Sequence, residues 1–329
     1  MKTPTQKILA LLLAVALAGS LGIAALANDT TIEFGSGANS APIAENLEYE
    51  TFKGVALTGK FKALDPDGDA LTFEITSAPK KGSVTPTESS EFVYTPADKS
   101  KGKDSFAYVA VDENGGVSAS ATVTVNIKKQ SGKTTYADMG GEKAHYAALV
   151  LSERGVFTGE KLGDEYFFRP GETVTRGEFL AMCLKLAGSE TIDGITKTGF
   201  SDDVDIPMWV KPYVSAGLMK GIVGGYRDES GRLVFSPNEP VTFAQAAVIV
   251  NKTLGITDVT GVAAVDDESV PAWARSASAN LTACDILPGG LATVAGESVT
   301  RSDAAQMLFA SAKVLDARDE GGGLLGWAK

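Results

Sequence analysis

The chain has few of the residues on which metal and nucleophile chemistry depends. Its 329 residues include one histidine and two cysteines. A zinc site or a Ser–His–Asp triad would therefore have only His145 to draw on. The sequence also lacks a nucleophile elbow, a phosphate-binding loop and a cluster of metal-binding histidines. These absences argue against metal-dependent and triad hydrolases.

Two cysteines are too few to hold a secreted scaffold together by disulfides, so a hydrophobic core has to stabilise the folded state. Hydrophobic residues make up 44% of the chain, and its length is typical of about two domains. Cys183 lies in the apolar stretch 179–184, where a small buried thiol is the simplest interpretation, and Cys284 has an analogous position in a later helical stretch. The sequence does not show whether the two sulfurs meet in a bridge.

Long apolar runs are absent except at the N-terminus. Two lysines precede the apolar run 8–17, and an Ala-Leu-Ala motif ends at Ala27. This order is typical of a secretory signal peptide, so we expect residues 1–27 to be removed and residues 28–40 to form a short extension. The alternative is an uncleaved membrane anchor, because residues 8–26 approach the ~20 residues that span a bilayer.

Acidic residues outnumber basic ones. The chain has 41 Asp and Glu against 30 Lys and Arg, a formal net charge of −11. Loss of the two signal-peptide lysines would leave −13. An acidic surface repels nucleic acid and anionic lipid headgroups, so we expect neither as a partner and no membrane contact after signal cleavage. An anionic polymer would have to be bound by local arginines.

Residues 41–128 have the pattern of an antiparallel β domain. Short runs alternate apolar and polar residues, and turn residues such as Gly, Pro, Asn and Asp separate them. The runs are 71–75, 91–94, 105–109 and 121–125. Helical periodicity is absent there, and the pattern predicts an all-β antiparallel sandwich.

The same region carries an ordered series of short motifs. They are Asp65-Pro66-Asp67-Gly68-Asp69, Gly82-Ser83-Val84, Phe92-Val93-Tyr94-Thr95-Pro96, Asp104-Ser105-Phe106-Ala107-Tyr108 and Asp112-x-Asn114-Gly115. This series resembles the bacterial cadherin-like or Ig-like domains of surface and adhesive proteins. The resemblance implies a spacer or adhesion domain, whose partner the sequence does not identify.

Aspartates in this domain are candidate ligands of a cation. Asp65, Asp67 and Asp69 alternate with turn residues, so their carboxylates can converge on a hard cation such as Ca²⁺, with Asp112 as the next candidate. The motif is not an EF-hand loop, because its spacing differs and no Glu closes the frame. The alternative is an Asx turn whose side chains bind backbone N–H groups. We therefore expect no required cofactor and one candidate calcium site.

The C-terminal half repeats a motif that opens a helix. Val-Thr pairs at 174–175, 241–242 and 299–300 each begin an apolar helical stretch, and the threonines lie 67 and 58 residues apart. Each Thr is a candidate N-cap, and the residue three positions later can bind the backbone of the cap in return. Those partners are Glu178, Gln245 and Asp303. This spacing is typical of repeated supersecondary units.

Arginine follows the capping threonine in two of the three copies. Arg176 and Arg301 fall in the first helical turn, where the helix dipole disfavours a cation by roughly 0.3–1 kcal/mol. A guanidinium beside free N–H groups is well suited to an anionic ligand. We therefore expect both arginines to lie exposed at helix N-termini and to contact an anion.

A second set of positions follows the same repeat. An aromatic-x-Asp motif, a Trp-led helix, a Gly-Ile-x-x-Gly-Tyr turn and a Phe-x-Pro motif precede the Thr motif. In the second copy these are Phe200–Asp202, Trp209, Gly221–Tyr226 and Phe235–Pro237. The order resembles the S-layer homology family over residues 136–315.

The resemblance implies three repeats at 136–190, 198–256 and 262–315, folded as a mainly α-helical pseudo-trimer around a central bundle. Residues 129–135 would form a linker and residues 316–329 a flexible tail. Within the family, grooves between the repeats bind anionic secondary cell-wall polysaccharide, often carrying pyruvyl ketals.

On this resemblance, the polysaccharide-binding residues are Arg176, Glu178, Asp202, Trp209, Tyr226, Asp266, Trp273 and Arg301. A tryptophan offers a flat face for sugar stacking, and an arginine offers a bidentate handle for a carboxylate. The copies differ: Phe243 stands where an arginine is expected, and Asp285 replaces a glycine. We expect one or two working grooves, for instance one built from Arg176 and Trp209. Alternatively, the tryptophans are core residues and the aspartates cap their own helices.

Together these patterns predict a non-catalytic exported protein that is bound non-covalently to the cell wall, within the S-layer, and displays the β domain. One alternative is a secreted wall-glycan hydrolase with Glu172 and Glu178 as acid and base, although acidic pairs are common in so acidic a chain. Another is a self-assembling S-layer subunit, which a measurement of oligomeric state would distinguish.

Overall fold

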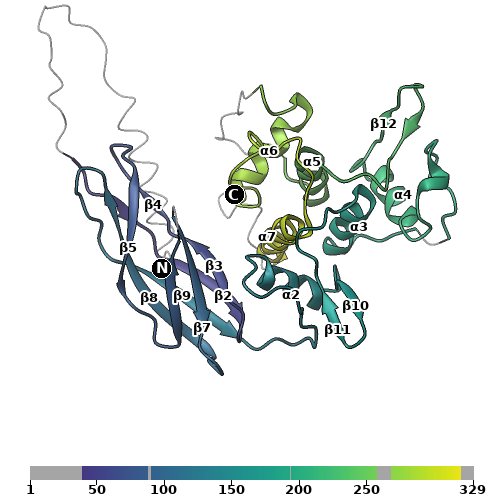
Figure 1. Ribbon diagram of the computed structural model, residues 1–329. Coiled ribbons are helices and arrows are strands. Elements are labelled where there is room, and N and C mark those ends of the chain that lie inside the picture. The colour runs from purple at the N-terminus through teal and green to yellow at the C-terminus, as the bar shows by residue number, and fades with distance from the viewer. Residues whose placement is uncertain (1–38, 88–89, 193, 258–267, 320–329) are drawn as a thin grey trace, which may run out of the picture. The chain divides into compact units, whose positions relative to one another are not determined.

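The computed structural model describes residues 39–87, 90–192, 194–257 and 268–319 (Figure 1). The expected signal peptide, most of the expected extension and tail, and Asp266 lie outside the described residues. None of the described helices is long and apolar enough to cross a membrane.

The N-terminal part is β-rich, as the alternation in the sequence predicts (Figure 1). One sheet has the strand order β2 (Leu47–Phe52), β9 (Ala121–Lys128), β8 (Gly102–Asp112), β5 (Leu71–Ser77). The second has the order β3 (Leu57–Lys60), β7 (Glu91–Pro96), β6 (Gly82–Pro86), and β1 (Ile43–Ala44) pairs with β4 (Ala63–Leu64). Neighbouring strands are antiparallel except β2 and β9, which run parallel.

The core between these two sheets is aromatic. Phe92 and Tyr94 on β7, and Phe106 and Tyr108 on β8, are each at most 2% exposed. Alternate residues of a strand face the same side, so residues two apart enter the core together. The rings of Phe92 and Phe106 meet edge to face, with centroids 5.1 Å apart. Burial of these large rings stabilises the sandwich.

The C-terminal part consists of helices and short hairpins. The first repeat contains α2 (His145–Glu153), β10 (Glu160–Leu162), β11 (Glu165–Phe167) and α3 (Arg176–Leu186). The second contains η1 (Asp203–Asp205), α4 (Lys211–Met219), β12 (Tyr226–Arg227), β13 (Leu233–Val234) and α5 (Phe243–Leu254). The third contains η2 (Ala272–Ala274), α6 (Arg275–Ala283) and α7 (Arg301–Asp319), and its described residues form no hairpin.

The second helix of each repeat lies at the centre of this part (Figure 1). Helices α3, α5 and α7 contact one another, and each also packs against the first helix of another repeat. The pairs are α3 with α4, α5 with α6 and α7 with α2. The order is cyclic, because the third repeat packs back on the first. The central bundle that the resemblance implies is present, with three interfaces between neighbouring repeats.

All three predicted helix caps are present. Thr175 Oγ1 accepts a hydrogen bond from Glu178 N, and the Glu178 carboxylate accepts one from Thr175 N. Thr242 with Gln245, and Thr300 with Asp303, form the same reciprocal pairs. Each cap stabilises its helix by about 1 kcal/mol and fixes the first turn. The caps thereby position the residue after each threonine.

The valines before these threonines close a ring of backbone hydrogen bonds. Val174 N donates to Val299 O at 3.0 Å, Val299 N to Val241 O at 2.9 Å, and Val241 N to Val174 O at 3.0 Å. All three valines are buried. The ring relates the three repeats by a pseudo-threefold axis, so corresponding residues can be compared directly.

The turn after the first helix of each repeat needs a left-handed residue. Gly155 and Gly221 each have a φ of 67°, and Asp285, which replaces the glycine in the third repeat, has a φ of 58°. Aspartate adopts this conformation more readily than most residues with a side chain. The substitution therefore preserves the course of the backbone.

The two cysteines are unpaired. Cys183 is buried in α3, and burial raises the pKa of its thiol well above the ordinary value. Cys284 follows α6 and is half-buried, and burial raises its thiol pKa as well. Since only a thiolate is strongly nucleophilic, neither residue is suited to covalent catalysis.

Candidate functional site

The first turn of each central helix contacts the neighbouring repeat. The first residues of α3, α5 and α7 are Arg176, Phe243 and Arg301, and their backbone N–H groups donate to carbonyl oxygens of the adjacent repeat at 2.8–2.9 Å. The acceptors are the carbonyls of Glu239, Glu297 and Glu172, in the same order. The three contacts, named here the Arg176, Phe243 and Arg301 interfaces, share one backbone frame and differ in their side chains.

At the Arg176 interface, the guanidinium lies beside an aromatic ring and has no acidic partner among the described residues. Its Cζ is 5.1 Å from the centroid of the Phe235 ring, and its Nε is buried without a hydrogen bond. Burial lowers the pKa of Arg176, and the nearby Tyr226 opposes that shift. Arginine stays protonated at neutral pH even so. The interface therefore holds a positive charge that no carboxylate of the described chain balances.

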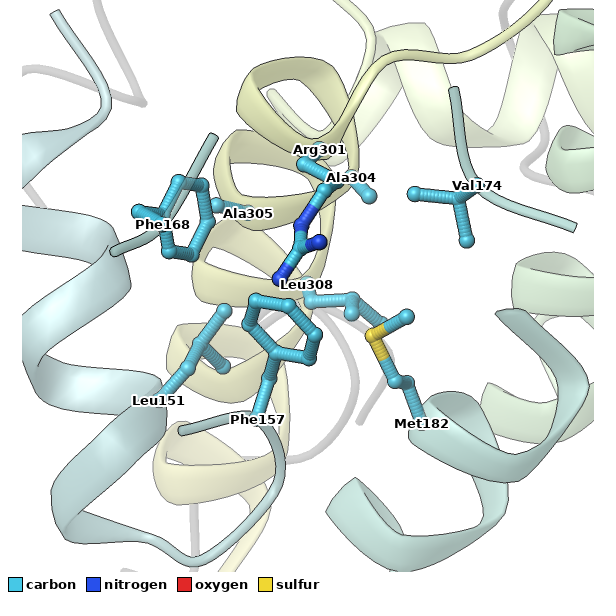
Figure 2. Close-up of a pocket in the computed structure, with 9 residues that line it drawn as sticks. All are labelled: Leu151, Phe157, Phe168, Val174, Met182, Arg301, Ala304, Ala305 and Leu308. Carbon is cyan, nitrogen blue, oxygen red and sulfur yellow. The ribbon is translucent and has the colours of Figure 1, made fainter. Parts of the chain in front are cut away.

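At the Arg301 interface, two carboxylates contact the guanidinium. Arg301 Nη1 lies 3.5 Å from Glu160 Oε1 and 3.3 Å from Glu172 Oε2. Its Cζ is 4.5 Å from the Phe157 ring centroid and 5.7 Å from that of Phe168 (Figure 2). The side chain is 12% exposed, whereas the two glutamates are about half exposed. The charge of Arg301 is therefore balanced by its own chain.

The expectation that both arginines lie exposed at helix N-termini is wrong. Arg176 is half-buried and the Arg301 side chain is mostly buried. The reason is the cyclic packing, which places an aromatic ring of the next repeat, Phe235 or Phe168, against each guanidinium. The prediction from the sequence treated each helix terminus in isolation and could not include this neighbour.

The two tryptophans that the sequence assigns to the site are exposed. Trp209 is 55% exposed and Trp273 is 60% exposed, so the alternative that they are core residues is wrong. Trp209 lines a groove of about 310 Å³ between the first and second repeats. Glu178 and Lys185 on α3 and Tyr213 on α4 line the same groove. Arg176 is not part of its lining, so the structure does not join Arg176 and Trp209 in one pocket.

Asp202 holds a loop and does not cap its own helix, so the capping alternative is wrong for Asp202, whereas Asp266 lies outside the described residues. Its carboxylate accepts hydrogen bonds from Phe235 N at 2.9 Å and Ser236 N at 2.7 Å. Asp138 does the same in the first repeat, accepting from Phe168 N and Arg169 N. Asp202 thus fixes the Phe-x-Pro loop that supplies the ring beside Arg176.

The two candidate acid–base residues of the hydrolase alternative are already engaged. Glu172 pairs with Arg169 at 3.0 Å and with Arg301, and Glu178 belongs to the cap of α3. Glu178 is therefore a structural residue, in addition to lining the groove of Trp209.

The residues that make the two arginine interfaces different were not predicted from the sequence. Phe235 lies beside Arg176, and Ser236 contacts Tyr226, which is near Arg176. Glu160 contacts Arg301, and Arg169 pairs with Glu160. Aligning the repeats with one another would have pointed to these residues. Arg169 occupies the variable position of the first Phe-x-Pro motif, as Ser236 does in the second, and both have a φ of 55°.

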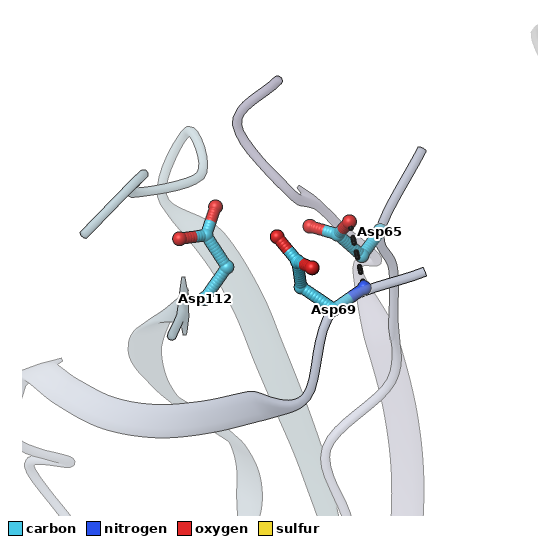
Figure 3. A group of neighbouring side chains, drawn as sticks. All are labelled: Asp65, Asp69 and Asp112. Atoms are coloured by element: carbon cyan, nitrogen blue, oxygen red, sulfur yellow. Dashed lines mark hydrogen bonds between the residues drawn. The ribbon is translucent and has the colours of Figure 1, made fainter. Parts of the chain in front are cut away.

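The β domain brings three of its four candidate cation ligands together (Figure 3). Carboxylate oxygens of Asp65, Asp69 and Asp112 lie within 4.8 Å of one another. Asp65 Oδ2 is buried and has no hydrogen-bond partner. Carboxylate oxygens are the ligands that Ca²⁺ prefers, so this donor set fits a hard cation. Asp67 is exposed and outside the group.

The same aspartates also form Asx turns. Asp65 Oδ1 accepts from Asp67 N at 2.9 Å and from Asp69 N at 3.2 Å. Asp112 Oδ1 accepts from Asn114 N at 2.9 Å and Gly116 N at 2.8 Å. The calcium site and the Asx turns are thus compatible interpretations. One carboxylate oxygen of Asp65 and one of Asp112 bind the turns, and these turns hold the remaining carboxylate oxygens near one another.

Two domain families match the chain. Residues 39–129 match a bacterial cadherin-like domain, and residues 199–247, the second repeat, match the S-layer homology domain. The first match covers the β-sandwich, and the second covers the repeat that contributes Trp209, Tyr226 and Phe235.

The chain is similar to parts of two larger proteins. It is 25% identical over 133 residues to the surface-layer 125 kDa protein of Lysinibacillus sphaericus, covering 39% of this chain and 10% of that protein. It is 26% identical over 183 residues to an amylopullulanase of Thermoanaerobacterium thermosulfurigenes, covering 53% of this chain and 9% of that protein. The chain thus spans about a tenth of the length of these relatives.

Among solved structures, an endo-fucoidan hydrolase of glycoside hydrolase family 107 matches 29% of this chain and 14% of its own, with 22% identity and a TM-score of 0.24. That score is too low to bear on function. The S-layer homology domain and the similarity to a surface-layer protein indicate a protein of the cell surface that is associated with the cell wall.

Proposed function

We propose that this chain, which joins a bacterial cadherin-like domain to S-layer homology repeats, is a non-catalytic protein that binds an anionic cell-wall polysaccharide. The observation that carries the proposal is the unbalanced charge of Arg176. Removing a charged group from water costs free energy unless a partner compensates. No described carboxylate supplies that partner, so an anionic group of a ligand is the best candidate.

The chemistry around Arg176 favours a carboxylated sugar. The guanidinium can bind a carboxylate with two parallel hydrogen bonds, and a pyruvyl ketal would supply such a group. The Tyr226 hydroxyl and Ser236 Oγ, which lie 2.5 Å apart beside it, can exchange hydrogen bonds with sugar hydroxyls. Trp209 and Trp273 offer exposed faces on which neighbouring sugars can stack.

A co-sedimentation assay with purified sacculi tests this proposal. Wild-type protein should sediment with intact sacculi and remain in solution when the secondary polymer has been stripped off. Arg176→Ala should weaken binding roughly tenfold to a hundredfold, because loss of a charged hydrogen bond costs about 1.5–3 kcal/mol. Arg154→Ala removes the same charge from a surface pair with Asp316 and should bind as wild type does. Wild-type binding by Arg176→Ala would refute the proposal.

Catalysis is not part of the proposal. The two carboxylates that a hydrolase would need are used in an ion-pair network and in a helix cap. Incubation of the protein with sacculi should release no reducing ends, and release that depends on Glu172 or Glu178 would instead support the hydrolase alternative. A concentration-dependent assembly in solution would support a self-assembling subunit.

The β domain has a second candidate function, the binding of a calcium ion. Three carboxylates within 4.8 Å of one another repel unless a cation offsets their charge. We propose that Asp65, Asp69 and Asp112 hold Ca²⁺ and that Asp67 contributes through its place in the turn. This role would stiffen a domain that serves as a spacer or adhesion module.

A further inference from the structure

The Arg176 and Arg301 interfaces are equivalent in backbone and opposite in charge balance. Each arginine is the first residue of its helix, donates its N–H to a glutamate carbonyl and lies beside the phenylalanine of a Phe-x-Pro loop. If the frame alone determined function, both interfaces would bind an anion equally well. The side chains that differ therefore decide which interface can do so.

The differing residues occupy matching places in the two hairpins. Gly159 and Gly225 both have a positive φ, and a Cβ added to either would lie 2.5–2.6 Å from a carbonyl oxygen of the opposite strand. The residue after each glycine is Glu160 in the first repeat and Tyr226 in the second. The first repeat thus carries an acid where the second carries a neutral hydroxyl.

The second difference lies in the Phe-x-Pro loops. The variable residue is Arg169 in the first repeat and Ser236 in the second, and in both cases it contacts the residue after the hairpin glycine. Arg169 pairs with Glu160 at 3.1 Å and with Glu172 at 3.0 Å. A charged pair thus replaces the neutral contact between Tyr226 and Ser236.

Glu160 and Glu172 also contact Arg301. The first repeat thus supplies Arg301 with carboxylates that would otherwise come from a ligand. Glu160 and Glu172 are about half exposed and lie over a guanidinium that is only 12% exposed. An incoming anion would have to displace them and would be repelled by their charge. At the Arg176 interface, the equivalent Glu239 is exposed and forms no ion pair with Arg176.

We propose that Glu160 and Glu172 close the Arg301 interface against anionic ligands, so that, of the two arginine interfaces, only the one at Arg176 is open to an anion. The inference rests on the proposed function, because it assigns that function to one of two equivalent interfaces. Glu160 and Glu172 are thus specificity-determining residues that act through Arg301. Their removal creates a second site.

The test measures binding by isothermal titration calorimetry of the full chain, with a monosaccharide that carries a pyruvyl ketal as the probe. Arg176→Ala should abolish most binding. Adding Glu160→Gln and Glu172→Gln to this variant should raise the affinity for the probe by about tenfold or more, because the probe then gains a charged hydrogen bond for which no carboxylate of the chain competes. Adding Arg301→Ala as well should remove the gain.

Controls separate the inference from its alternatives. Glu142→Gln with Glu165→Gln changes the net charge equally at two exposed glutamates of the same repeat, and should produce no gain. A gain that persists without Arg301 would assign the new site to Arg169 and overturn the inference. If the glutamine variant unfolds, Glu160→Tyr with Arg169→Ser and Glu172→Gln, in which the hairpin and the Phe-x-Pro loop copy the second repeat, should produce the same gain.

The proposed function and the inference fail in different ways. Failure of the wild-type protein to bind the probe counts against the proposed site at Arg176. Absence of any Arg301-dependent gain in the glutamine variants overturns the inference, whether or not the wild type binds.

Discussion

The two halves of the chain hold opposite kinds of charge imbalance. In the helical half, Arg176 is a half-buried cation with no carboxylate partner among the described residues. In the β half, Asp65, Asp69 and Asp112 gather three carboxylates within 4.8 Å, and one oxygen of Asp65 is buried without a hydrogen bond. Each arrangement costs free energy in the isolated protein, which suggests an anionic ligand for one half and a cation for the other.

Lys211 shows how the same fold neutralises a buried cation that has a structural role. Lys211 is 6% exposed, and its Nζ lies 2.7 Å from Asp203 Oδ2. The comparison teaches that burial alone does not mark a binding residue. What distinguishes Arg176 from Lys211 and from Arg301 is the lack of a counter-charge.

The largest effect should come from breaking the balanced pair. Asp203→Asn leaves Lys211 buried without a counter-charge and should lower the free energy of unfolding by about 3 kcal/mol. Lys211 and the Thr198 backbone lower the pKa of Asp203 to about 2, below its unfolded value. The stability from this pair is therefore complete above the unfolded pKa and is lost as the pH falls towards 2. Denaturant unfolding across pH checks both points, and an unchanged midpoint for Asp203→Asn would contradict them.

The second effect should be confined to the β half. Calcium at a hundredfold excess over its dissociation constant should stabilise the native state by about 2.7 kcal/mol. We expect calorimetry of the full chain to show a calcium-dependent transition that Asp65→Asn with Asp69→Asn removes. Chelator should leave binding to sacculi unchanged, because the helical half does not need the cation. Identical melting curves with calcium and with chelator would favour the turn-only interpretation of the aspartates.

The smallest effect on binding should come from Trp209, and Phe243 of the third interface serves as its comparison. Trp209→Ala should weaken binding to sacculi by a few-fold to tenfold, since stacking on an aromatic ring contributes about 0.5–1.5 kcal/mol. Phe243→Ala should change binding much less, because Phe243 stands where the other interfaces have an arginine and cannot pair with a carboxylate. Circular dichroism must show that both variants are folded. A larger loss in Phe243→Ala would contradict the assignment.

Much of the fold is predictable from the sequence because its signals are local. Strand alternation predicted the four strands that became β5, β7, β8 and β9, and the Val-Thr motifs predicted the caps of α3, α5 and α7. Alternating residues and capping boxes depend on neighbours within a few positions, so no tertiary information was needed. The parallel pairing of β2 with β9 was not predicted, since it joins segments far apart in the chain.

The site was harder to predict because its character depends on contacts between repeats. The sequence identified Arg176 and Arg301 by the same motif and gave no reason to separate them. Their difference arises from Glu160 and Tyr226, which reach the arginines of other repeats through the cyclic packing. Comparison of the hairpins position by position would have shown this difference, but only the fold shows which arginine each hairpin meets.

The most direct test of the account compares Arg176→Ala and Arg301→Ala for binding to purified sacculi under identical conditions. The account predicts that Arg176→Ala loses roughly tenfold to a hundredfold in affinity, while Arg301→Ala, whose charge is already balanced by Glu160 and Glu172, stays within a factor of about two. Both variants should unfold at denaturant concentrations close to those of the wild type. Equal losses in the two variants, or a larger loss in Arg301→Ala, would contradict the account.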